Sequence, residues 1–146
     1  MNLTKPALAA LCVAALLAAC GDSSSSPGPT ESALRSTAED YFEAFVGADG
    51  RRVSELTDPA CGLSVADATS AMLIAAGFSY GFAGANMEEF EYSITAVNVS
   101  GKTGAVTTEV SVDGEAFAEE DVTADFVFID GEGWRADDCL DLDVSE

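Results

Sequence analysis

The side chains that could do chemistry in this sequence are its acids and its cysteines. The chain of 146 residues has 26 Asp and Glu, 4 Cys and no His. Histidine is the usual general base at neutral pH and the commonest protein ligand of transition metals. Its absence excludes Ser-His-acid and Cys-His catalysis.

Three acids lie near the interiors of expected helices or strands, namely Asp67, Glu109 and Asp125. Glu109 and Asp125 alternate away from their apolar neighbours along a strand, and Asp67 has the spacing of a helix cap. We interpret all three as solvated carboxylates and assign no catalytic residue.

The acidic run near the end of the chain raises the question of a calcium site. Asp137, Asp141 and Asp143 share one face of an expected strand, and hard cations prefer oxygen ligands. The spacing is not that of an EF-hand loop, and most such clusters are simply solvated. We therefore expect no metal and no cofactor.

Cys20 ends a segment with the features of an export signal. Lys5 supplies positive charge, and residues 7–17 are apolar but shorter than the ~20 residues of a membrane span. Leu17-Ala18-Ala19-Cys20 resembles the lipobox of bacterial lipoproteins, which implies cleavage before Cys20 and lipidation of its thiol. An ordinary signal peptide with an incidental Cys is the alternative.

These features divide the chain into a signal peptide (1–19), a flexible Ser, Gly and Pro tether (20–30) and one domain (31–146). The net charge of −20 repels phosphates and anionic headgroups, so we expect no nucleic-acid partner and attachment through the lipid alone. The domain would then lie at the extracytoplasmic face of the cell membrane.

Cys61 and Cys139 remain for the exported domain, because Cys12 lies in the signal and Cys20 carries lipid. Disulfides form outside the cytoplasm, and a bridge over this separation stabilises by roughly 4 kcal/mol in the chain-entropy model. Two buried thiols or a metal pair are the alternatives. We predict the disulfide.

Helical spacing of apolar residues predicts helices over residues 30–48, 51–56 and 64–82. Thr30 is the expected cap of the first helix, and Ser64 and Asp67 have the spacing of a capping box that opens the third. The third helix is almost entirely apolar. We expect it to be buried on most sides or to line a cavity.

Alternating apolar residues predict strands over residues 90–99, 105–112, 116–129 and 134–142. Asp113-Gly114 is a hairpin signal between the second and third of them. Helices followed by antiparallel strands indicate the α+β class, with the helices on one face of a curved sheet of about four strands.

Several local features together resemble the nuclear transport factor 2-like (SnoaL-like) family over residues 31–142. They are the Tyr41-Phe42 pair, Gly47-Ala48-Asp49, and the turn Asp130-Gly131-Glu132-Gly133-Trp134-Arg135. The resemblance implies a cone-shaped, cystatin-like roll that often houses a small apolar ligand. Enzymes of this family use an Asp or an Asp-His pair inside the cone, and this chain lacks the His. Many actinobacterial lipoproteins look like this.

The third helix carries the candidate binding residues. Small residues would leave space above the sheet, and large ones at the rim would close over an apolar guest. The candidate ligand-binding residues are Met72, Ala75, Phe78, Tyr80 and Phe82. Close packing of Gly77, Gly81 and Gly84 onto the sheet is one alternative explanation for the glycines of this stretch, and membrane association through their GxxxG-like spacing is another.

We therefore expect a non-enzymatic, lipid-anchored domain that binds a small apolar ligand or an envelope protein. An isomerase-like or hydrolase-like enzyme with a buried Asp is the first alternative. A purely structural envelope lipoprotein with a filled cone is the second.

Overall fold

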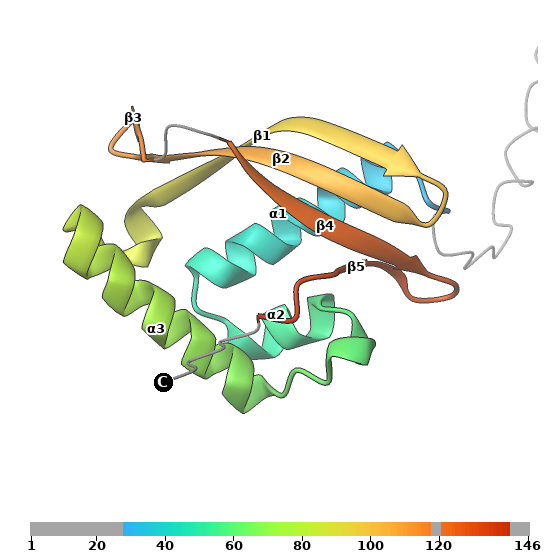
Figure 1. Cartoon of the computed structure of the whole chain (residues 1–146), viewed down its shortest axis with the longest axis horizontal. Coiled ribbons are helices and arrows are strands. Elements are labelled where there is room, and N and C mark those ends of the chain that lie inside the picture. The colour runs from blue at the N-terminus through green and yellow to red at the C-terminus, as the bar shows by residue number, and fades with distance from the viewer. Residues whose placement is uncertain (1–27, 118–120, 141–146) are drawn as a thin grey trace, which may run out of the picture.

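The computed structural model describes residues 28–117 and 121–140 (Figure 1). The predicted signal peptide (1–19), Cys20 and most of the tether lie outside the described residues. The helices are α1 (Glu31–Val46), α2 (Gly50–Leu56), η1 (Pro59–Cys61), α3 (Val65–Ala83) and η2 (Met87–Glu89). The strands are β1 (Phe90–Ser100), β2 (Thr103–Val112), β3 (Glu115–Ala116), β4 (Val122–Ile129) and β5 (Gly133–Ala136).

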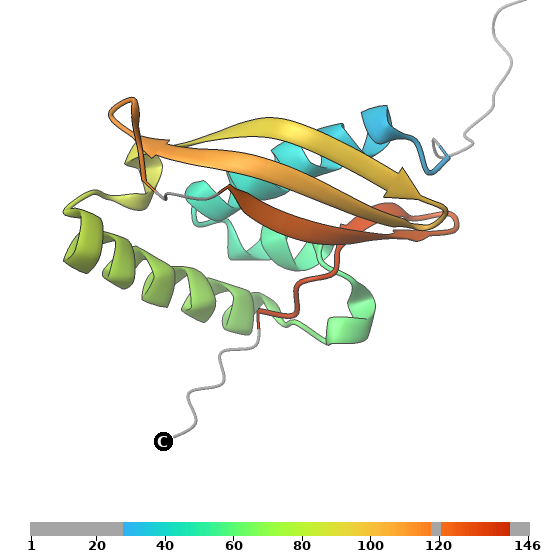
Figure 2. The same ribbon diagram turned by 45° about the horizontal axis from the view of Figure 1, so that its top comes forward.

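The α+β prediction is confirmed, with three α-helices beside a curved antiparallel sheet (Figure 2). The strand order is β1-β2-β4-β5, and β3 pairs with the end of β2. The two predicted helix starts are also confirmed. The Thr30 side chain accepts a hydrogen bond from the Ala33 amide at 3.2 Å, and Ser64 and Asp67 form the capping box of α3.

The main core lies between α1 and the sheet. From α1 it takes the side chains on one helical stripe, and from the sheet it takes alternate residues of β2, β4 and β5. Its buried members include Leu34, Ala38, Tyr41, Val106, Phe126, Phe128 and Trp134. Burial of such side chains supplies most of the stabilisation of the fold.

Gly104 sets how closely α1 approaches the sheet. A Cβ at this position would lie 2.4 Å from Leu34 Cδ2 and 3.1 Å from the Trp134 ring. Leu34 is 0% exposed and Trp134 is 1% exposed, so neither has free space to move into. The absence of a side chain at Gly104 therefore allows α1 to contact β2 and β5 at this end of the helix.

β1 contains a bulge that changes which residues face inward. Ile94 pairs with Thr108 and Ala96 pairs with Thr107, so Thr95 is an extra residue. A bulge bends its strand and increases the local twist. The inward series of Tyr92 and Ile94 consequently continues at Val97 rather than at residue 96.

The prediction of one strand over residues 116–129 is wrong. Residues 115–116 pair with the end of β2, whereas β4 begins at Val122 and pairs with residues 103–108 of β2. Two separate segments thus use the same edge of β2. The intervening sequence includes acids with low strand propensity.

The prediction of a last strand over residues 134–142 is wrong in its extent, because β5 ends at Ala136. The Ala136 carbonyl accepts a hydrogen bond from the Asp58 amide at 2.9 Å, so the chain turns toward η1 there. Cys139 then lies at disulfide distance from Cys61, with 5.0 Å between the Cα atoms. The pairing that was predicted from cysteine counting is the one in the structure.

The expectation that α3 is buried on most sides is wrong. Its first half buries Ala68, Ala71 and Met72, but Leu73 is 67% exposed and Tyr80 is 66% exposed. When apolar residues lie on all sides of a helix, the sequence does not predict which side packs against the rest of the protein. None of the described helices is both long and apolar enough to cross a membrane.

The glycines of α3 are not explained by close packing. A Cβ at Gly77 or Gly81 would meet nothing within 4 Å, so the close-packing interpretation is wrong for both. Gly84 has φ of +67° and ends the helix in the left-handed conformation, which glycine adopts at no steric cost.

Replacing glycine by alanine should change the stability of the protein in opposite directions at two positions, and this tests the packing. Gly104→Ala should lower the free energy of unfolding by about 1–3 kcal/mol, because the added methyl overpacks Leu34 and Trp134. Gly77→Ala should raise it by up to about 1 kcal/mol, because alanine favours a helix and has open space there. Urea denaturation measures both changes. Equal effects at the two positions would contradict the close approach of α1 to β2.

Removing the disulfide between Cys61 and Cys139 tests how much it stabilises the domain. Because Cys61 and Cys139 are 78 positions apart, Cys61→Ser combined with Cys139→Ser should cost about 4 kcal/mol of unfolding free energy. Reductant should destabilise the wild-type protein to the same extent and leave the double variant unchanged. Two alkylatable thiols at these positions in the unreduced protein would refute the disulfide.

Candidate functional site

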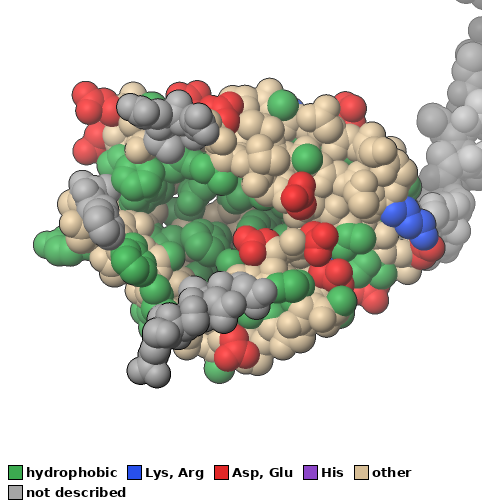
Figure 3. Space-filling model, in the orientation of Figure 1, with side chains coloured by type: hydrophobic (Ala, Val, Ile, Leu, Met, Phe, Trp, Pro, Cys, Tyr) green, Lys and Arg blue, Asp and Glu red, His purple; other side chains and the backbone are tan. Residues whose placement is uncertain are grey.

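The described residues form a groove of about 440 Å³ between α1 and β1. We call it the α1–β1 groove. Its lining comes from the last turns of α1, from η2 and from the first half of β1, and consists of Glu39, Phe42, Glu43, Val46, Gly47, Glu88, Phe90, Tyr92 and Ile94. Figure 3 shows a different feature, a hollow with hydrophobic side chains between the sheet and α3, whereas no residue of α3 lines the α1–β1 groove.

The walls of the groove are aromatic and aliphatic. The rings of Phe42 and Tyr92 stack nearly parallel, with 5.2 Å between their centroids and 3° between their planes. Phe90 is buried next to them, and Ile94 packs against the main core. Burial raises the pKa of the Tyr92 hydroxyl, which therefore stays neutral at physiological pH.

The rim of the groove is acidic. Glu39 and Glu43 lie one turn apart on α1, and Glu88 lies on η2. All three side chains are exposed. Within the described residues, none of them forms an ion pair.

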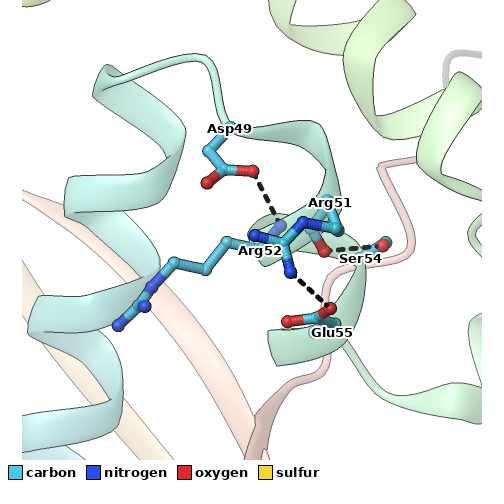
Figure 4. Close-up of polar contacts among 5 residues, drawn as sticks. All are labelled: Asp49, Arg51, Arg52, Ser54 and Glu55. Carbon is cyan, nitrogen blue, oxygen red and sulfur yellow. Dashed lines mark hydrogen bonds and ion pairs between the residues drawn. The ribbon is translucent and has the colours of Figure 1, made fainter.

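Polar contacts fix the corner where α1 ends and α2 begins, next to Gly47 of the groove (Figure 4). The Asp49 carboxylate accepts a hydrogen bond from the Arg52 amide at 3.0 Å and so caps α2. The Arg52 guanidinium lies 3.0 Å from the Asp40 carboxylate of α1, and Arg51 pairs with Glu55 at 3.4 Å. Of these contacts, the Arg52–Asp40 ion pair joins α2 to α1, and the other two lie at the start of α2 and within it.

The structure does not bring the predicted ligand-binding residues into this groove. Met72 is buried in the main core, Ala75 is half-buried, and Phe78 and Tyr80 are exposed on α3. The side chain of Phe82 lies outside the described ones. None of the described members of this set lines the α1–β1 groove.

The acids that were considered for catalysis are at the surface. Asp67, Glu109 and Asp125 are all exposed, and the buried polar side chains in the described part of the chain are Thr57 and Thr108. Residues 28–117 and 121–140 contain no cluster of three acids or cysteines that could hold a metal ion. Asp141 and Asp143 lie outside the described residues.

The sequence carries signals for the groove that the prediction did not use. Phe42 and Val46 are four residues apart on α1 and so share a face, and Phe90, Tyr92 and Ile94 alternate along β1. Each pattern alone predicts only a helix or a strand, and the groove exists because the two faces meet. Their meeting depends on residues about 50 positions apart in the chain.

Comparison with protein family models, with curated proteins and with solved structures found no match for this chain. We therefore base the proposed function on the groove and on the sequence features described above.

Proposed function

We propose that this chain is a lipid-anchored protein of the extracytoplasmic membrane face, and that its domain binds a small apolar ligand in the α1–β1 groove without transforming it. The observation that carries the proposal is the open groove of about 440 Å³ with aromatic and aliphatic walls. Ligand sites are typically concave, apolar and of this size. The anchoring part rests on the lipobox-like sequence that ends at Cys20.

The fold supports the same proposal. We infer that the helices and the curved sheet form the cone-shaped, cystatin-like roll of the nuclear transport factor 2-like (SnoaL-like) family. The support is the order of elements, with the helices before an antiparallel sheet and α1 across its inner face. The resemblance implies a cone that often houses a small apolar ligand.

Each alternative function requires a structural feature that the proposed function does not. An isomerase-like or hydrolase-like enzyme needs a buried carboxyl, and no acid among the described residues is buried. A purely structural protein would fill the space that the groove leaves. A protein partner is the second candidate, because Leu73, Ile74 and Tyr80 expose apolar surface on α3.

The three isoleucines of the chain report separately on these surfaces. Ile94 lines the groove, Ile74 is exposed on α3, and Ile129 ends β4. We expect 1-hexanol to shift the NMR signal of the Ile94 methyl group, and not that of Ile74, in full-length protein held in phosphatidylcholine nanodiscs. Empty nanodiscs correct for partition of the alcohol into lipid.

A larger side chain inside the groove should weaken the binding of hexanol. Val46→Phe should weaken hexanol binding by about tenfold or more, since the larger side chain occupies the groove. The same change at exposed Val122 is the control and should leave binding intact. Unchanged Ile129 signals show that both variants fold. A signal shift at Ile74 alone would indicate that the ligand binds to α3 instead. The absence of a shift at every isoleucine would refute ligand binding.

The anchor is tested in the native host. Cys20→Ser should leave the precursor uncleaved by the lipoprotein signal peptidase and unlabelled by a fatty-acid probe, because the thiol is the site of acylation. Cys12→Ser, within the signal peptide, is the matched control and should keep the label. Equal labelling of the two variants would exclude lipidation at Cys20.

A further inference from the structure

We propose that the α1–β1 groove selects apolar ligands that carry a positive charge, of which a primary alkylammonium is the simplest. This inference rests on the proposed binding function and specifies its ligand class. It comes from the combination of an apolar interior and a rim whose charges are all negative. Glu39, Glu43 and Glu88 are the charged residues of the lining.

Within the described residues, no cation forms an ion pair with this rim. The basic residues of the described part are Arg35, Arg51, Arg52, Lys102 and Arg135. Four of them pair with acids outside the groove, namely Glu55, Asp40, Asp130 and Glu132. Two of these pairs involve the arginines of α2, whose side chains Figure 4 shows.

Arg35 is the remaining cation and the nearest along α1 to the rim. It is exposed, lies four residues before Glu39, and forms no ion pair within the described residues. Glu39 and Glu43 have the same i,i+4 spacing to each other, and like charges at this spacing repel. A ligand cation at the rim would relieve that repulsion.

The walls favour the same class of ligand. Aromatic rings attract ammonium groups through their negative faces, and Phe42, Phe90 and Tyr92 line the same groove as the three glutamates. A carboxylate ligand would meet three negative charges in a chain whose net charge is already −20. An alkylammonium can bury its chain among the rings and keep its charged group hydrated beside the glutamates.

Three ligands of six carbon atoms each test the selectivity. Hexylammonium, 1-hexanol and hexanoate are titrated into the full-length protein in phosphatidylcholine nanodiscs, with the Ile94 methyl signal as readout. We expect hexylammonium to bind about tenfold more tightly than hexanol, from three exposed charge contacts of modest strength. Hexanoate should bind more weakly than hexanol. Added salt should reduce the advantage of hexylammonium.

Charge-neutral variants locate the source of the selectivity. Replacing Glu39, Glu43 and Glu88 together by Gln should reduce the hexylammonium preference to about threefold or less and leave hexanol binding unchanged. Glu91→Gln is the matched control, because Glu91 is exposed on β1 between two groove residues but does not line the groove. It should keep the full preference.

The outcomes separate the two proposals. Equal affinities for all three ligands at Ile94 would overturn the charge selectivity and leave the binding function standing. A preference that survives in the triple variant would show that the rim glutamates are not its cause and would also overturn the inference. The absence of any shift at Ile94 would overturn the binding function itself.

Discussion

The close approach of α1 to β2 at Gly104 is the constraint on which the rest of the structure depends. Leu34 and Trp134 fill the space that a side chain at Gly104 would take, so the helix is held against the sheet there. A straight helix cannot follow a curved sheet along its whole length, and the bulge at Thr95 bends β1 further. The α1–β1 groove lies beside the later turns of α1 and the first half of β1, where Phe42 and Tyr92 stack on each other.

The distribution of polar groups follows from this geometry. Residues that face the tight end of α1 are apolar and buried, whereas Glu39 and Glu43 on its later turns reach solvent beside the groove. Exposed carboxylates cost little in water, so an acidic rim is compatible with a stable apolar interior. The same helix thus supplies both the core that stabilises the domain and the charged edge that would discriminate between ligands.

Local signals in the sequence were sufficient for the helix starts and for most of the sheet. Thr30, Ser64 and Asp67 act on backbone groups within a few residues, so their roles are readable without tertiary information. The division of residues 116–129 into β3 and β4 was not readable, because both segments pair with distant parts of β2. The groove was missed for the same reason: it arises between α1 and β1, whose contacts join residues far apart in the chain.

The orientation of a bound alkylammonium tests the central claim most directly. Intermolecular nuclear Overhauser effects between hexylammonium and the Ile94 methyl group report which end of the ligand lies inside the α1–β1 groove. The account predicts contacts from the terminal methyl of the ligand to Ile94, with the methylene beside nitrogen remaining distant, since Ile94 packs against the core and the glutamates are exposed. Contacts from the nitrogen end to Ile94, or contacts to Ile74 of α3 instead, would contradict it.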